Sequence, residues 1–277
     1  MVGKMAIVNK KYQRWYNILY KFTNNSPSLK KLVHIVRRIQ DNIQYLFLET
    51  NSIDTENIIK ILNSDLTKIK IDKKIKNNWI NVFSKLKKLE IGENSGGVGN
   101  IDQEILHNLI KVYKRKKVLE IGTHIGKSTV AIAMALKGGK NNQLITVDIN
   151  DVNNRSEKNW LNFGSKNSPQ KNIEKLKLKN HVKFVISDSK KYMCKTKNKF
   201  DLIFLDGNHR TKEIYDEIIL SINLLEKDGI LVLHDYVESK SIFSIAGPFL
   251  AIKKLRLENK ELKVKLFKKS SLALISR

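Results

Sequence analysis

Short runs rich in apolar residues recur along the second half of the chain and alternate with stretches of helical spacing. The five runs lie at 118–121, 144–149, 182–186, 202–205 and 230–233, as expected of parallel strands that are buried on both faces. The clearest helical stretch between two of them spans 213–225. Two further runs, 265–268 and 272–275, lie too close together for a crossover helix and predict an antiparallel pair. The pattern predicts an α/β fold with five parallel strands and a C-terminal antiparallel hairpin.

The first 90 residues show helical spacing and carry no chemical motif. Apolar residues between 29 and 47 recur every three or four positions, which predicts an amphipathic helix that starts near Ser26-Pro27. Two shorter helices are predicted at 54–62 and 79–89, and a further one at 101–113. The segment 10–22 carries aromatic residues among basic ones, which fits packing against the main domain or a partner, or a helix at a membrane surface.

A glycine-rich stretch, 92–99, follows these helices. It lacks the Lys-Ser/Thr ending of a phosphate-binding loop. We interpret it as a linker, with a mobile flap over a ligand as the alternative. The chain then divides into a helical N-terminal appendage (1–95) and a second domain (96–277).

The segment KVLEIGTHIGKS, residues 117–128, joins the first strand to an Ala-rich helix. Glycine permits a tight turn and a close approach of a ligand to the backbone. The free N–H groups at the start of the following helix favour a negatively charged ligand group. The spacing E-x-G-x-x-x-G differs from the G-x-G-x-x-G of dinucleotide-binding proteins.

This segment resembles the first motif of class I S-adenosylmethionine-dependent methyltransferases, and the resemblance covers roughly residues 100–277. It implies a Rossmann-like methyltransferase sheet and S-adenosyl-L-methionine as the cofactor. Asp148 then accepts hydrogen bonds from the ribose hydroxyls, Asp188 lies beside the adenine, and Ser128 faces the methionyl carboxylate. The full set of expected cofactor-binding residues is Glu120, Gly122, Thr123, His124, Gly126, Ser128, Asp148 and Asp188.

The fourth and fifth strands, in DLIFLDGNHR and GILVLHDYV, resemble the metal-dependent small-molecule and sugar O-methyltransferases of the methyltransferase domain 24 type. In that branch an Asp at the end of each of these strands holds Mg²⁺, which places Asp206 and Asp235 as metal ligands. His234 stands where sugar-modifying relatives often carry a second acid, so it is a third candidate ligand or a packed, hydrogen-bonded histidine. Because histidine prefers softer ions, Mn²⁺ or another divalent cation is an alternative to Mg²⁺.

Catechol-type relatives carry a Lys three residues after the strand-four Asp, and His209 occupies that position here. A histidine there suits the removal of a hydroxyl proton near neutral pH; the alternative is a solvated loop histidine. We therefore expect His209 and Asp206 to be catalytic. Tyr236 replaces the Asn that such enzymes carry after the strand-five Asp, and Tyr is a poor Mg²⁺ ligand.

Composition and charge limit the kinds of partner and the cellular compartment that we expect for this protein. The net charge is +25, from 52 Lys and Arg against 27 Asp and Glu, but it is spread along the chain, which favours a solvated basic surface over a nucleic-acid footprint. The single cysteine, Cys194, excludes an internal disulfide and fits a reducing compartment. The sequence has no apolar run long enough to span a membrane, so we expect a cytoplasmic protein.

The leading functional hypothesis is metal-assisted O-methylation of a small hydroxylated acceptor, such as a sugar or a glycan precursor. Two alternatives stay open: an RNA-directed methyltransferase that uses the basic surface, and a non-catalytic partner protein with a cofactor fold. Oxygenase chemistry on the same fold is a further variant. Asp206-Gly-Asn-His209 lacks the proline-containing motif of base N-methylating enzymes, which argues against that activity. Homo-oligomerisation through the N-terminal helices is also an expectation.

Overall fold

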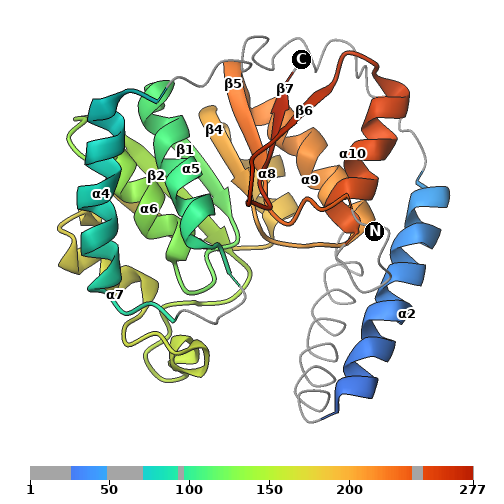
Figure 1. The fold of residues 1–277 in the computed structure, drawn as a ribbon, viewed down its shortest axis with the longest axis horizontal. Coiled ribbons are helices and arrows are strands. Elements are labelled where there is room, and N and C mark those ends of the chain that lie inside the picture. The colour runs from blue at the N-terminus through green and yellow to red at the C-terminus, as the bar shows by residue number, and fades with distance from the viewer. Residues whose placement is uncertain (1–25, 49–70, 93–96, 239–245, 277) are drawn as a thin grey trace.

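The computed structural model describes residues 26–48, 71–92, 97–238 and 246–276 (Figure 1). Its centre is a seven-stranded sheet with the order β3-β2-β1-β4-β5-β7-β6. Neighbouring strands are parallel from β3 to β5, whereas β7 is antiparallel to both β5 and β6. The strands are β1 (Lys117–Ile121), β2 (Gln143–Asp148), β3 (Val182–Ile186), β4 (Phe200–Leu205), β5 (Leu225–Leu233), β6 (Lys263–Leu266) and β7 (Ala273–Ser276). The predicted sheet of five parallel strands with a C-terminal antiparallel pair is confirmed.

Strands β4, β5 and β6 each begin at least two residues earlier than the sequence pattern predicts, β4 at Phe200. β5 starts at Leu225 because α9 (Thr211–Leu224) runs directly into it, and its pairing with β4 shifts register between Phe200 and Leu202. The polar residues 226–229 hide this start from a reading based on apolar runs. β6 starts at Lys263, since pairing with β7 rather than the apolar run sets its register.

Helices cover both faces of the sheet (Figure 1). Alternate side chains of each strand point to opposite faces, so Leu119 and Ile121 join one buried cluster while Val118 joins the other. The first cluster includes side chains of α9 and α10, and the second includes side chains of α4, α5 and α6. The remaining helices are α2 (Pro27–Leu46), α4 (Lys73–Lys87), α5 (Asn100–Val112), α6 (Lys127–Leu136), α7 (Pro169–Lys175), α8 (Ser189–Lys195) and α10 (Gly247–Glu258), with 3-10 turns η1 (Asn159–Phe163) and η2 (Lys179–His181).

The N-terminal helices pack on opposite sides of this core. Trp79, Val82 and Leu86 of α4 enter the buried cluster that α5 and α6 line, and α2 lies against α9 and α10 (Figure 1). The helices predicted near 29–47 and 79–89 are thus present, the latter starting six residues earlier. Those at 10–22 and 54–62 lie outside the described residues, and the domain boundary at residue 95 stays a prediction.

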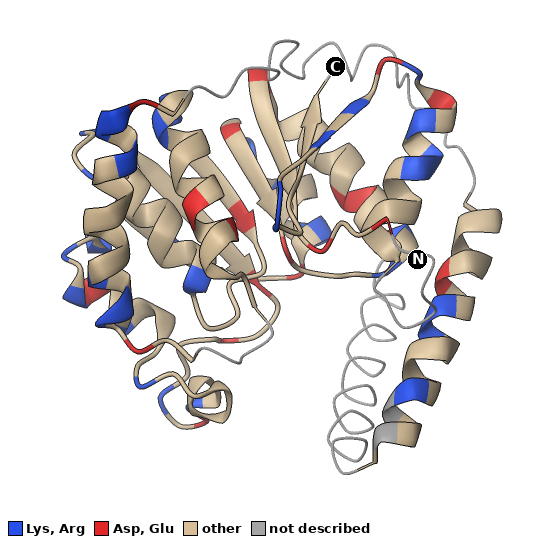
Figure 2. Ribbon diagram, in the orientation of Figure 1, with Lys and Arg blue, Asp and Glu red and all other residues tan. Residues whose placement is uncertain are grey.

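Positive charge is distributed over several elements. Figure 2 shows Lys and Arg on α2, α4, α10 and β6, which lie in different parts of the molecule. Within the described ranges, no helix is both long and apolar enough to cross a membrane.

Candidate functional site

The turn after β1 is shaped by two glycines with positive φ. Gly122 has φ +95°, and Gly126, which begins α6, has φ +82°. A β-carbon on Gly122 would lie 2.1 Å from the carbonyl oxygen of Asp206. Only glycine therefore lets the ends of β1 and β4 approach this closely.

Asp148, at the end of β2, is hydrogen-bonded to this turn. Its Oδ2 accepts hydrogen bonds from the backbone N–H groups of Thr123 (3.1 Å) and His124 (2.9 Å), and its Oδ1 accepts one from Asn150 (2.9 Å). The hydroxyls of Thr123 and Thr146 lie 2.6 Å apart beneath it. The carboxylate is thus fixed at the mouth of the turn, as the ribose-binding hypothesis requires.

Glu120 lies inside the protein. It is fully buried, and its Oε2 accepts a hydrogen bond from the Thr129 hydroxyl of α6 at 2.7 Å. Burial raises the pKa of Glu120 to about 7, although hydrogen bonds from Ser128, Thr146 and Thr129 favour the charged form. Through this hydrogen bond Glu120 links β1 to α6 inside the protein, which stabilises the turn between them.

A cavity of about 430 Å³ opens over the carboxyl ends of the strands, where parallel α/β sheets bind ligands. The expected site residues that line it come from the ends of five strands, β1 to β5: Gly122, His124, Asp148, Asp188, Asp206, His209 and Asp235. Glu120, Thr123, Gly126, Ser128 and His234 are not part of its lining. The structure therefore brings together the turn and all four acids that follow β2, β3, β4 and β5.

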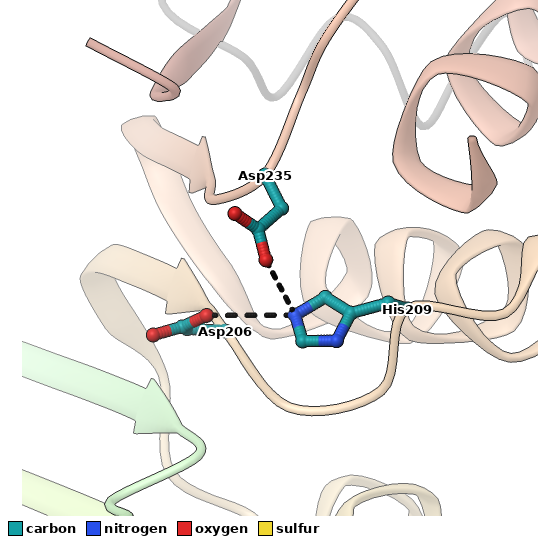
Figure 3. A group of neighbouring side chains, drawn as sticks. All are labelled: Asp206, His209 and Asp235. Carbon is teal, nitrogen blue, oxygen red and sulfur yellow. Dashed lines mark ion pairs between the residues drawn. The ribbon is translucent and has the colours of Figure 1, made fainter. Parts of the chain in front are cut away.

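Asp206, His209 and Asp235 line the cavity and point toward one another (Figure 3). The His209 Nε2 lies 3.1 Å from Asp235 Oδ2 and 3.7 Å from Asp206 Oδ1. Each residue offers a ligand atom within 4.8 Å of the others. Asp235 has φ +53°, a backbone conformation that is uncommon outside glycine and clusters at functional sites.

The electrostatics of this group are strongly coupled. Burial opposes a charged His209, but its contacts with Asp206 and Asp235 raise its pKa to about 9. Burial would likewise raise the pKa of Asp235, yet the bonds with His209 and His234 hold it well below its usual range. In this state each carboxylate is paired with an imidazolium.

His234 lies behind these residues, with only 5% of its surface exposed. Its Nδ1 is 3.0 Å from Asp206 Oδ1 and 3.3 Å from Asp235 Oδ1, and its Nε2 is 3.4 Å from Asp102 Oδ2. Burial would lower the pKa of His234, but Asp206, with Asp102 and Asp235, raises it to about 12. These contacts fit a packed histidine that orients the two acids; its role as a metal ligand stays a prediction.

Two site residues, both acids, are not predicted by the sequence. Asp102 of α5 contacts His234 and accepts a hydrogen bond from the Ser270 hydroxyl. Glu217 of α9 is 2% exposed, lines the cavity and accepts a hydrogen bond from Ser189 at 2.5 Å. Acids within a helical pattern resemble solvated residues, so no sequence signal singles these out.

The polar insertion at 151–168 places its two aromatic residues differently. Trp160 is buried, whereas Phe163 is 41% exposed. The Phe163 ring meets the edge of the His124 ring, with centroids 4.4 Å apart. One aromatic residue thus packs inside, and the other contacts a cavity residue.

Comparisons with known proteins agree with this geometry. Residues 119–236 match the model of a methyltransferase domain family. Among solved structures, cofactor-bound Rv0187 from MTB shares 18% identity over 82% of this chain and 98% of its own, with a TM-score of 0.50. A Klebsiella pneumoniae protein provisionally classed as an O-methyltransferase shares 16% identity over 75% of this chain and 91% of its own, also at 0.50. No curated protein is matched.

The matched segment begins within β1 and ends just after Asp235. It therefore contains the glycine turn and all four strand-end acids. The solved structures share the arrangement of the sheet at low sequence identity, which speaks for the fold alone. Together with the sheet order, the family match over residues 119–236 supports a class I S-adenosylmethionine-dependent methyltransferase domain in this part of the chain.

Proposed function

We propose that the protein transfers the methyl group of S-adenosyl-L-methionine to a hydroxyl oxygen of a small acceptor, such as a sugar or a glycan precursor, with the help of a divalent cation. The observation that carries this proposal is the meeting of Asp206, His209 and Asp235 in the cavity that the glycine turn also lines. A methyl donor at the turn and a hydroxyl at the acids would then share one space. The family match supports the transfer chemistry.

The donor set fits a divalent cation. The two carboxylates offer oxygen ligands that suit Mg²⁺, Mn²⁺ or a similar ion. Asp206 and Asp235 would hold it, while His234 contacts both carboxylates and Asp102 contacts His234 from behind. A bound cation would supply a Lewis acid that lowers the pKa of the acceptor hydroxyl.

His209 is the proton acceptor in this proposal. A cation held by Asp206 and Asp235 would offset the carboxylate charge that raises the pKa of His209, so that a neutral Nε2 could accept a proton. The acceptor oxygen attacks the methyl carbon, the carbon–sulfur bond breaks with its electron pair moving to sulfur, and the hydroxyl proton passes to Nε2. Alignment supplies most of the remaining rate enhancement.

In this proposal the cofactor lies against the glycine turn, and Asp148 accepts hydrogen bonds from the ribose hydroxyls. Asp188, Ser189 and Glu217 line the space beyond it, and the Glu217 Oε2 is buried with no hydrogen-bond partner among the described residues. Carboxylate oxygens need N–H or O–H donors, and the exocyclic amino group of adenine offers two N–H donors. We therefore place the adenine amino group at Glu217.

Glu217→Gln is expected to weaken binding of S-adenosylhomocysteine and to remove a pH dependence. Burial raises the pKa of Glu217 to about 7, and the ionised form accepts the amine, so wild-type affinity should rise by up to about tenfold from pH 6 to 8. Titration calorimetry of both proteins across this range measures the effect. Glu174→Gln, on the surface helix α7, is the control. Equal pH profiles for wild type and Glu217→Gln would remove Glu217 from the cofactor site.

Calorimetric titration of S-adenosylmethionine into the purified chain tests the proposed function, first with chelator and then with Mg²⁺ or Mn²⁺. We expect micromolar binding that Asp148→Ala abolishes, because Asp148 both shapes the turn and faces the ribose. Methyl transfer from labelled cofactor to a panel of sugars and catechols then identifies the acceptor class. Absence of cofactor binding under both conditions would refute the proposal.

A further inference from the structure

Helix α2 is attached to the protein through its polar side. Asp41, only 1% exposed, pairs with the Arg210 Nε at 3.0 Å. The Gln40 side chain accepts a hydrogen bond from Arg210 at 2.9 Å, and the Gln44 side chain accepts one from the Lys212 backbone N–H at 3.2 Å. These contacts fix the orientation of the helix against the start of α9.

The apolar side of α2 therefore faces outwards. Six residues, which we call the seam, are each 46–72% exposed: Leu29, Leu32, Val36, Ile39, Ile43 and Leu46. Phe47, next to the seam, is 79% exposed. Figure 1 places α2 at the side of the molecule, beyond α9 and α10. A contiguous exposed apolar stripe of this kind marks an interaction site.

The spacing of the seam points to another helix as its partner. Successive seam residues are separated by three, four, three, four and three positions, the 3.5-residue repeat of a coiled coil. Leu29, Val36 and Ile43 take the first apolar position of each heptad, and Leu32, Ile39 and Leu46 take the second. β-Branched residues at two of the three first positions, with leucine at two of the three second positions, favour two-stranded pairing.

The charges around the seam favour a second copy of this same helix over a lipid surface. The positions that flank the seam are Val33, Ile35, Gln40 and Asn42, so two copies meet without like-charge repulsion. Arg37 and Arg38 act electrostatically on the buried Asp41. A helix at an anionic membrane instead has a broad apolar face bordered by free basic side chains.

We propose that a second copy of this chain covers the seam, with the two α2 helices paired side by side. Docking on α9 holds each helix in shape before pairing, which offsets the instability of a short isolated helix. The interface is isologous, since each copy offers the same stripe to the other.

Sedimentation analysis of the full chain tests this inference. The wild type is expected to be dimeric at about 10 µM, and the double variant Ile39→Glu/Ile43→Glu monomeric, with dimer affinity reduced by at least about a hundredfold, since it places four carboxylates in one apolar interface. The matched control is Ile80→Glu on α4, because Ile80 is 57% exposed, close to the 54% of Ile39. This variant should stay dimeric.

A folding check keeps the result interpretable. Circular dichroism should show equal helix content in wild type and variants; if the double glutamate variant fails to fold, Ile39→Ala/Ile43→Ala replaces it, with weaker dimerisation expected. A monomeric wild type, or a dimer that survives both double variants, would overturn the proposal. So would a monomer that binds phosphatidylglycerol vesicles through the seam, which would assign the stripe to a membrane surface.

Discussion

Asp235→Asn is expected to weaken Mn²⁺ binding by at least about a hundredfold, because loss of even a residue that only orients a ligand costs 10–100-fold. Asp206→Asn should have the same effect, since both carboxylates converge with His209 in one group. Methyl transfer to an acceptor found by screening should fall by about 10²–10⁴, the usual contribution of a positioned acid or base. Calorimetry with Mn²⁺ and a labelled-methyl assay measure the two effects.

The matched control is Asp216→Asn. Asp216 lies on α9 and pairs with Lys190 at 3.1 Å, and it does not line the cavity. Binding of S-adenosylhomocysteine should persist in all three variants, which separates loss of the cation from misfolding. Wild-type Mn²⁺ affinity in both Asp206→Asn and Asp235→Asn would show that the acids do not hold a cation.

Gly122→Ala is expected to destabilise the fold by about 3 kcal/mol or more. The substitution places a β-carbon 2.1 Å from the Asp206 carbonyl oxygen, on a backbone with φ +95°. The left-handed conformation alone costs about 1–2 kcal/mol, and overpacking against a fixed backbone adds about 1–3 kcal/mol. Urea unfolding measures the change in the free energy of unfolding.

Gly138→Ala separates the two contributions. Gly138 has the same φ of +95°, but a β-carbon there would meet nothing within 4 Å. This variant should therefore lose only the conformational part, about 1–2 kcal/mol. If both alanine variants lost equal stability, the close approach of β1 and β4 would carry no energetic weight.

The strand ends were predictable because chemistry and pattern coincide there. Each buried strand is an apolar run with an acid at or just beyond its end, as Asp206 is directly after β4 and Asp235 is two residues after β5. Parallel strands end at one edge of the sheet, so the meeting of Asp148, Asp188, Asp206 and Asp235 around one cavity follows from the sequence alone. The turn at Gly122 and Gly126 was predictable for a similar reason, since the spacing of the two glycines indicates a tight turn.

The remaining site residues depend on packing between helices and sheet. Glu217 belongs to no motif, and the sequence suggests only one more polar position in α9. It is buried because α8 lies against α9. Asp102 reaches His234 only through the tertiary position of α5. The apolar stripe of α2 was predictable from its period. Its outward orientation follows from the contact of Asp41 with Arg210, 169 positions later in the sequence, which periodicity does not report.

The docking of α2 also restrains the segment 206–212, which carries His209. This segment is held at its start by the Asp206 N–H, which donates to the Ile121 carbonyl at 2.8 Å, and at its end by the contacts of Arg210 and Lys212 with α2. Gly247 closes against the His209 carbonyl, where a β-carbon would lie 1.9 Å away. The entropy of ordering this loop is therefore lost on folding, so an acceptor that enters the cavity meets a histidine already in place and spends little binding energy on arranging it.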